Sequence, residues 1–478
     1  MVGFIWLSIV PPALAIILAI FTRRIIPSLF MGVLAGGYLL TPSFTGGLRN
    51  VVDYLVNTVA DKGNLQVLLF LYLFSGFVFL IRRSGGIKEF SDRMERRITS
   101  KRGVFFILWA LIPLTFIDCG FHVVATGNIT RTIASKNGIS RRRLAFMLNN
   151  TASPIVELVP VATTFVGYNI TIIQQGLTAA GIQNQSGYQV LLKAIPLEFF
   201  SLVVIAVTFL SIFRRDKESG NMAGTQLEQV TKRGEGDMPG MTEDSRPEIK
   251  PRLFNLIVPL VSIVALSIFF FWYLGIQNAH GDISISAVIA NTQPNVAMLM
   301  ALLVSLLMVA TMYLFQKYPL KKMSDDLLSG GNQIMKTLAI LALAWSLAAI
   351  SQDLGLSTFI RQEVGTSLPA WSLAVVLFVA SGAVTYFIGS GWGATSLIMP
   401  FAIPLAVSTG ASIPLTVAAI LSGGTFGDVT SPVSGMSNMS SNVAGADHMG
   451  YIKYATRFNF VAAAIAAALF VVWSLSFG

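Results

Sequence analysis

Long apolar runs separated by short charged segments dominate this sequence. The runs that charge delimits lie at 4–22, 26–42, 65–81, 103–130, 144–170, 191–213, 254–275, 294–315, 333–350, 370–408, 413–442 and 455–477. A helix that crosses a bilayer needs about 20 predominantly apolar residues. Because most runs approach or exceed this length, the pattern predicts an all-α polytopic membrane protein.

The apolar pattern is interrupted once, between residues 214 and 252. This stretch holds eight Lys and Arg and eight Asp and Glu, with almost no large apolar residues. Such a composition cannot bury enough apolar surface to fold. It predicts a solvated linker between two domains, 1–213 and 253–478.

Composition narrows the function classes. Of the 478 residues, 54% are hydrophobic and only 12% are charged, whereas soluble domains carry about 25% charged residues. A soluble enzyme, a disordered chain and a single-anchor receptor are therefore excluded. Cys119 is the only cysteine, which rules out a disulfide within the chain. We expect no cofactor besides a coupling ion, and membrane lipid and a small ion or solute as partners, with no nucleic acid.

The distribution of basic residues predicts the orientation. All but four of the 33 Lys and Arg lie in segments that alternating spans place on one side of the membrane; the exceptions are Arg49, Lys62, Lys193 and Arg361. Cytoplasmic segments retain Lys and Arg. We therefore expect a multi-pass protein of a bacterial-type inner membrane, with the linker in the cytoplasm and both termini outside.

One run does not fit a simple crossing. Basic residues flank 103–130 at both ends, so both ends should be cytoplasmic. The run is long enough for two half-helices, and it predicts a re-entrant hairpin whose tip lies near Asp118. Residues 387–392 resemble residues 116–121, which predicts a second hairpin at 370–408. Because only Arg361 precedes it, this hairpin should enter from outside.

The second half of the chain repeats the first. Residues 150–154 (Asn-Thr-Ala-Ser-Pro) are echoed by residues 428–432 (Asp-Val-Thr-Ser-Pro). Each half contains about five spans and one hairpin, and an odd number of crossings inverts the second copy. The sequence thus predicts two inverted repeats with broken helices at the midplane, an arrangement typical of the binding site of a secondary transporter.

Candidate binding residues gather at the breaks and hairpin tips. A broken helix presents free N–H and C=O groups that attract ions, and hydroxyl and amide oxygens beside them suit Na⁺. The candidate ion- or substrate-binding residues are Asp118, Thr126, Asn128, Asn149, Asn150, Thr151, Ser153, Glu157, Ser390, Thr395, Ser396, Asp428, Thr430, Ser431 and Ser434. Candidate Na⁺ ligands among them are Asn150, Thr151, Ser153, Thr430 and Ser431. The alternative is that these Ser and Thr residues are ordinary packing residues of membrane helices.

Acidic residues inside the apolar runs are the most informative of this set. An ionisable group in the membrane is costly and by default functional. Asp118 is the foremost candidate, although it could instead cap the second half-helix of its hairpin. Glu157 and Asp428 are similar candidates. Glu198 lies near the outer end of a run, where we expect water to reach it, and is left out of the set.

The motifs at these positions resemble a known family. Residues 426–434 (Phe-Gly-Asp-Val-Thr-Ser-Pro-Val-Ser), residues 444–448 (Ala-Gly-Ala-Asp-His), Asp118 and the segment 149–160 are similar to the NhaC family of sodium/proton antiporters, within the ion transporter superfamily. This resemblance implies Na⁺-coupled secondary transport by an elevator motion in a homodimer. Asn149 and Asn150 stand where sodium/proton-exchanging members tend to carry acidic residues, which leaves open whether protons take part.

Two other function classes stay open. One is a Na⁺- or H⁺-coupled transporter or exchanger of a small organic acid or amino acid, since relatives in the family move such solutes. A remote alternative is an intramembrane hydrolase that uses paired aspartates as acid and base. The context Gly-Thr-Phe-Gly-Asp before and at Asp428 departs from the Gly-x-Gly-Asp of intramembrane aspartyl proteases. We therefore expect a transporter and no enzyme.

Overall fold

The computed structural model describes residues 2–95, 100–213, 249–279, 284, 288–289, 291–364 and 368–477. Throughout these residues every regular element is a helix. Eight helices in this part of the chain are long and apolar enough to cross a membrane, and a ninth span results if Gly187–Leu197 and Phe199–Ser211, bent by 42°, count as one. The predicted all-α polytopic fold is confirmed. Residues 214–248 of the predicted linker lie outside the described residues.

The first half of the chain contains short as well as long helices. They are η1 (Val2–Ile9), α1 (Val10–Thr22), α2 (Ile25–Leu40), α3 (Phe44–Ala60), α4 (Lys62–Arg83), α5 (Gly86–Glu95), α6 (Lys101–Thr115), α7 (Cys119–Lys136), α8 (Arg141–Asn150), α9 (Ser153–Leu158), α10 (Thr164–Ala179), α11 (Gly187–Ala194), η2 (Ile195–Leu197) and α12 (Phe199–Ser211). The predicted run 144–170 is thus divided among α8, α9 and α10.

The second half also contains short as well as long helices. Its helices are α14 (Phe254–Asn278), α16 (Pro294–Phe315), α17 (Leu320–Gln333), α18 (Met335–Asp353), α19 (Leu356–Phe359), a π-helical turn η4 (Ile360–Val364), α20 (Ala370–Ile388), α21 (Gly391–Thr409), α22 (Ile413–Thr430), α23 (Gly435–Ala444) and α24 (His448–Phe477). Helices α3 and α17 lie outside the predicted runs. Both mix charged and apolar residues, so a search for continuous apolar runs misses them.

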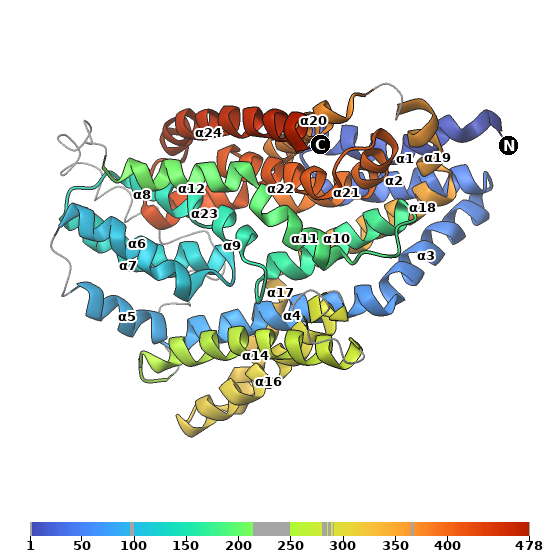
Figure 1. Cartoon of the computed structure of the whole chain (residues 1–478). Helices are drawn as coiled ribbons and strands as arrows, with labels where there is room; N and C mark the ends of the chain where they lie inside the picture. The colour runs from blue at the N-terminus through green and yellow to red at the C-terminus, as the bar shows by residue number, and fades with distance from the viewer. Residues whose placement is uncertain are drawn as a thin grey trace.

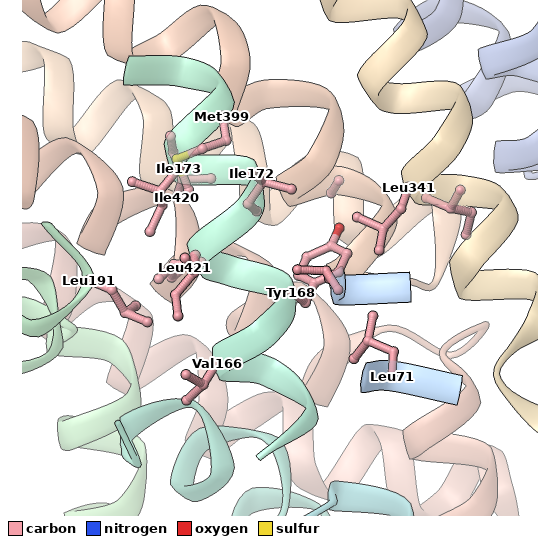
Figure 2. Close-up of a cluster of buried hydrophobic side chains, with 14 of the residues drawn as sticks. Leu71, Val166, Tyr168, Ile172, Ile173, Leu191, Leu341, Met399, Ile420 and Leu421 are labelled. Atoms are coloured by element: carbon pink, nitrogen blue, oxygen red, sulfur yellow. The ribbon is translucent and has the colours of Figure 1, made fainter. Parts of the chain in front are cut away.

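The long helices run side by side between two ends of the molecule (Figure 1). Helices α5, α6 and α7 lie towards one end, and α1, α18 and α19 lie towards the other. Helix α10 runs through the core between them. Figure 2 shows buried side chains of neighbouring helices around it, including Leu71 of α4, Leu191 of α11, Leu341 of α18, Met399 of α21 and Leu421 of α22. Helix α10 is therefore held by both halves of the chain.

Proline explains where the second broken helix is interrupted. Helix α22 ends at Thr430, and Ser431 is extended with φ −68° and ψ 131°. The residue before a proline is pushed out of the helical region, and proline itself has no N–H to continue the hydrogen-bond ladder. Pro432 therefore ends α22 inside the apolar run. In the first half, α9 begins at Ser153 with Pro154 in its first turn, where proline is well tolerated.

Both predicted hairpin segments are divided into two packed helices. Helix α6 ends at Thr115, and α7 begins at Cys119 with Asp118 as its N-cap. Helix α20 ends at Ile388, Gly389 caps its C-terminus with a left-handed φ of 76°, and Ser390 caps α21. The breaks thus lie at the predicted tips. The re-entrant course of the hairpins and the inverted relation of the halves stay predictions.

Candidate functional site

A small cavity lies where the two halves of the chain meet. Its volume is about 10 Å³, which is close to the minimum needed for one water-sized occupant. Helices α9, α10, α21 and α22 enclose it, and its lining consists of Ser153, Glu157, Phe165, Tyr168, Asn169, Gly391, Trp392, Thr395, Gly424, Thr425 and Asp428. We call it the inner cavity. Two carboxyl groups line it, and none of its described lining residues is Lys, Arg or His.

Asp428 joins the two breaks. Its Oδ2 accepts a hydrogen bond of 2.9 Å from the Ser153 hydroxyl, and its Oδ1 accepts one of 2.7 Å from the Ser434 hydroxyl. The Ser434 oxygen also accepts from the N–H groups of Met436 and Ser437 and thereby caps α23. The predicted residues Ser153, Asp428 and Ser434 are therefore brought together in one cluster.

Glu157 supplies the second carboxyl group from the other half of the chain. It is buried, and its Oε2 accepts a hydrogen bond from the Thr425 hydroxyl. Thr425 precedes Asp428 by three residues on α22, so the two face the same side. Charged groups taken out of water are costly unless they are paired. With hydroxyl and amide groups as partners and no basic residue among the described lining of the cavity, this pair of carboxyl groups is suited to bind a cation.

Aromatic rings cover the inner cavity on the side of α21. The Trp392 ring lies 5.0 Å from that of Phe165 and 4.6 Å from that of Tyr168, measured between centroids. The Tyr168 hydroxyl donates to the backbone carbonyl of Trp392. These contacts join the tip of the α20–α21 hairpin to α10, so opening the cavity on this side requires the hairpin and α10 to separate.

The tip of the first hairpin lies next to this cluster. Asp118 Oδ1 accepts from the Phe121 N–H at 2.8 Å and Oδ2 from the Thr164 hydroxyl at 3.4 Å, which is the capping role weighed from the sequence. The neighbouring Cys119 lies close enough to both Asp118 and Asp428 to interact with their charges. Asp118 thus stands outside the lining of the inner cavity but near it.

Asn149 and Asn150 connect the first break to the second. Asn149 Nδ2 donates to the Val429 carbonyl at 3.3 Å and to the Tyr451 hydroxyl at 2.6 Å. Asn150 Nδ2 donates to Asn459 Oδ1 at 2.8 Å. The side-chain amide of Asn149 therefore donates to the Val429 carbonyl, which the break in the helix leaves without a backbone partner in the described part of the chain. Within the described residues, Asn150 Oδ1 and Thr430 Oγ1 are buried without a hydrogen-bond partner, and both remain candidate Na⁺ ligands.

Of the remaining predicted residues, one lines the inner cavity and most of the others make hydrogen bonds within the surrounding helices. Thr395 lines the inner cavity, whereas Ser390 caps α21 and Ser396 bonds to the Gly393 carbonyl. The other residues of the predicted set lie elsewhere: Ser431 donates to the Tyr386 carbonyl, Thr151 and Thr126 contact His122, and Asn128 is exposed on α7.

Several residues of the site were not predicted. Thr425, Tyr168 and Asn169 line the inner cavity, but nothing in their local sequence marks them. Glu198 was expected to be reached by water, yet it is fully buried. Because the chain bends between α11 and α12, at Ile195–Leu197, the Glu198 side chain points towards the protein interior. It lies close enough to Glu157 to interact with its charge, and Pro196 in this run was the available signal.

A close approach of backbones at the second hairpin tip gives a testable prediction. A Cβ added at Gly389 would lie 2.5 Å from the Val433 carbonyl oxygen, whereas one added at Gly410 meets nothing within 4 Å. Both glycines have left-handed φ values, 76° and 72°, so each substitution has a similar conformational cost of about 1–2 kcal/mol. We expect Gly389→Ala to lower the melting temperature much more than Gly410→Ala. Equal decreases in melting temperature would show that the backbone at the hairpin tip can shift to accommodate the added Cβ.

Asp118 can be tested for a role beyond capping. Asparagine caps helices as well as aspartate does, so we expect Asp118→Asn to leave the melting temperature without ligand nearly unchanged. Because the charge lies near but outside the inner cavity, the substitution should weaken Na⁺ binding less than removal of the Asp428 charge. The measurement is the Na⁺-dependent melting shift, with choline at equal ionic strength. An unchanged shift would assign Asp118 to capping alone.

Comparison with protein families decides the broad class. The family model described as "Na+/H+ antiporter family" matches residues 155–475. The chain belongs to this Na⁺/H⁺ antiporter family. The match includes Glu157 and Asp428 and both α20–α21 and α22–α23. Together with the membrane-spanning fold, it supports a secondary transporter of the membrane.

Two relatives come from Haemophilus influenzae. An uncharacterized protein is 26% identical over 467 residues, which cover 94% of this chain and 86% of the relative. An uncharacterized Na⁺/H⁺ antiporter is 28% identical over 112 residues, or 23% of each chain. The first relative is similar along nearly the whole length of this chain, whereas the similarity to the second is local.

Two solved transporter structures are similar in fold. MtrF of Neisseria gonorrhoeae, described as illuminating a class of antimetabolite efflux pumps, aligns with a TM-score of 0.55 at 15% identity and covers 90% of this chain and 85% of its own. The YdaH transporter of Alcanivorax borkumensis, described as having an unusual topology, aligns with a TM-score of 0.57 at 15% identity, covering 89% and 88%. At this identity the similarity concerns the fold alone.

Proposed function

We propose that this transporter is an NhaC-like antiporter that exchanges Na⁺ for protons at the inner cavity. The observation that carries the proposal is the pair Glu157 and Asp428, buried carboxyl groups from opposite halves of the chain that line one cavity of about 10 Å³. Two buried negative charges without a basic partner must be neutralised. Either Na⁺ or protons can do this, and the two then compete for the same oxygens.

Each residue has a proposed part in the exchange. Asp428 provides the charged ligand for Na⁺, and the hydroxyl groups of Ser153 and Ser434, which now donate to it, turn their oxygens to the ion. Glu157 takes up a proton when Na⁺ leaves. The first broken helix carries Asn149 and Asn150 instead of acidic residues, and Glu157 on α9 supplies the charge that those positions lack.

The size of the inner cavity favours an ion over an organic solute as cargo. A volume of about 10 Å³ holds no molecule larger than water. An organic acid would in addition meet two carboxyl groups and no basic residue among the described lining. Exchange of an organic acid or amino acid at this cavity is therefore the weaker alternative.

The proposal extends to the motion and the assembly. We propose an elevator motion in which the two hairpins and the broken helices move together against a frame that includes α4, α14 and α16, because α9, α21 and α22, three of the four helices that line the inner cavity, belong to the first group. We further propose a homodimer in a bacterial-type inner membrane, with the linker in the cytoplasm and both termini outside. The motion and the dimer rest on the family resemblance, and the orientation rests on the placement of basic residues.

Exchange can be measured directly with the full-length protein in liposomes that contain a pH-sensitive dye. With the membrane potential clamped, an inward Na⁺ gradient should drive protons out of the lumen, whereas an equal choline gradient should not. If an Na⁺ gradient moves no protons but still drives ²²Na⁺ exchange, the protein transports Na⁺ without coupling to protons. If neither flux appears, the proposed function is wrong.

A further inference from the structure

A second and much larger cavity lies at the end of the molecule where α3 meets α4. Its volume is about 610 Å³. The α3–α4 turn, the second half of α10 and the beginnings of α11 and α16 form its wall together with the last turns of α18. We call it the outer cavity. Small-molecule sites in proteins commonly measure about 300–1,000 Å³, so the outer cavity has room for an organic solute.

The outer cavity is separate from the inner cavity but shares a helix with it. Residues 165, 168 and 169 of α10 line the inner cavity, whereas residues 170, 171, 174, 175, 178 and 179 line the outer one. No residue lines both. A solute in the outer cavity therefore contacts neither Asp428 nor Glu157, and its binding can be tested independently of the exchange site.

The wall of the outer cavity is rich in hydrogen-bond acceptors. The carboxylates of Asp61 and Asp353 line it, and none of its described lining residues is Lys, Arg or His. Gln175 Oε1 and Asn295 Oδ1, also in the wall, have no hydrogen-bond partner within the described residues. Rotation of a terminal amide turns such an oxygen towards a ligand. The lining thus offers more acceptors than donors and a negative charge.

An aromatic residue completes the lining. Trp345 is 1% exposed, and its indole N–H has no hydrogen-bond partner in the part of the chain that the structure describes. The indole ring is the aromatic surface that best attracts an organic cation. This property favours an organic cation over a bare metal ion.

We propose that the outer cavity binds a small organic solute that carries a primary ammonium group. The ammonium group donates to Asp61, Asp353 and the free amide oxygens, and the apolar part of the solute packs on Trp345. A bare Na⁺ cannot span a cavity of 610 Å³ to reach these groups together. The proposal goes beyond Na⁺/H⁺ exchange and does not depend on it.

The test uses three probes of similar size on the purified full-length protein. They are 2-phenylethylammonium, the neutral 2-phenylethanol and the anionic 3-phenylpropanoate, each titrated by calorimetry at fixed ionic strength. We expect the ammonium probe to bind at least about tenfold more tightly than either of the others. Equal affinities of the three probes, or binding of Na⁺ alone with no ammonium binding, would overturn the proposal.

Variants locate the bound probe. The double substitution Asp61→Asn and Asp353→Asn should weaken binding of 2-phenylethylammonium by at least about tenfold. The matched control is Asp53→Asn, the same chemical change at an exposed residue of α3 that pairs with Arg49 and does not line the cavity; it should leave the affinity unchanged. Equal losses in the double variant and the control, or no loss in the double variant, would contradict this location.

Two further variants distinguish the cavities. Trp345→Phe retains an aromatic ring that attracts cations less strongly than indole does, and we expect it to weaken ammonium binding while the protein still melts cooperatively. Asp428→Asn should leave ammonium binding intact even where it abolishes the response to Na⁺. If Asp428→Asn also removes ammonium binding, the probe occupies the inner cavity, and the outer-cavity proposal is wrong whatever the fate of the exchange proposal.

Discussion

Asp428→Asn should weaken Na⁺ binding by well over tenfold, that is by more than about 1.4 kcal/mol. Asp428 is the carboxylate on which the hydroxyl groups of Ser153 and Ser434 converge, at 2.9 and 2.7 Å. Asparagine has nearly the same shape, so the packing of the two breaks is retained while the negative charge is lost. The measurement is the Na⁺-dependent melting shift of the purified protein at fixed ionic strength, with choline as the control cation.

The control for this prediction is an aspartate that makes a similar local contact at the surface. Asp447 is exposed and accepts a hydrogen bond of 2.6 Å from the Gly450 N–H. Asp447→Asn should retain the wild-type response to Na⁺. If Asp428→Asn responds to Na⁺ as the wild type does, Asp428 only fastens the two breaks together, and the inner cavity is not the Na⁺ site.

Most of the fold could be predicted because a membrane imposes simple rules on a sequence. Continuous apolar runs predicted the long helices, and proline placed the second break, since Pro432 removes a backbone donor from α22. The first hairpin followed from the basic residues that flank 103–130, and the second from the resemblance of residues 387–392 to residues 116–121. Helices α3 and α17 could not be found in this way, because their amphipathic pattern does not produce an apolar run.

The site could be predicted in its residue types but not in its pairings. Ser153, Asp428 and Ser434 were all candidates, but the sequence did not indicate that these three side chains contact one another. The structure brings all three together because the breaks in α8–α9 and α22–α23 cross at one place. Such long-range contacts have no local signal. Glu198 shows the same limit, since its burial depends on a bend of 42° between two helices and not on its neighbours in sequence.

Glu157→Gln should remove one proton from the exchange while leaving the inner cavity intact. If Na⁺ displaces a proton from Glu157, the apparent Kd for Na⁺ should rise about tenfold for each pH unit of acidification for that proton. Glutamine keeps the length of the side chain and can still accept from Thr425, but it cannot release a proton. We therefore expect the variant to bind Na⁺ with a pH dependence shallower than that of the wild type by one proton.

The experiment is a titration of Na⁺ binding at several pH values, with wild type, Glu157→Gln and Glu198→Gln compared. Glu198 is the matched control, because it is a second buried glutamate that interacts with the charge of Glu157 but does not line the inner cavity. Glu198→Gln should retain the wild-type slope, since its carboxyl group exchanges no proton with Na⁺. A slope that Glu157→Gln leaves unchanged would exclude Glu157 as the proton carrier. A slope reduced by Glu198→Gln alone would place the coupled proton at the bend between α11 and α12, outside the inner cavity.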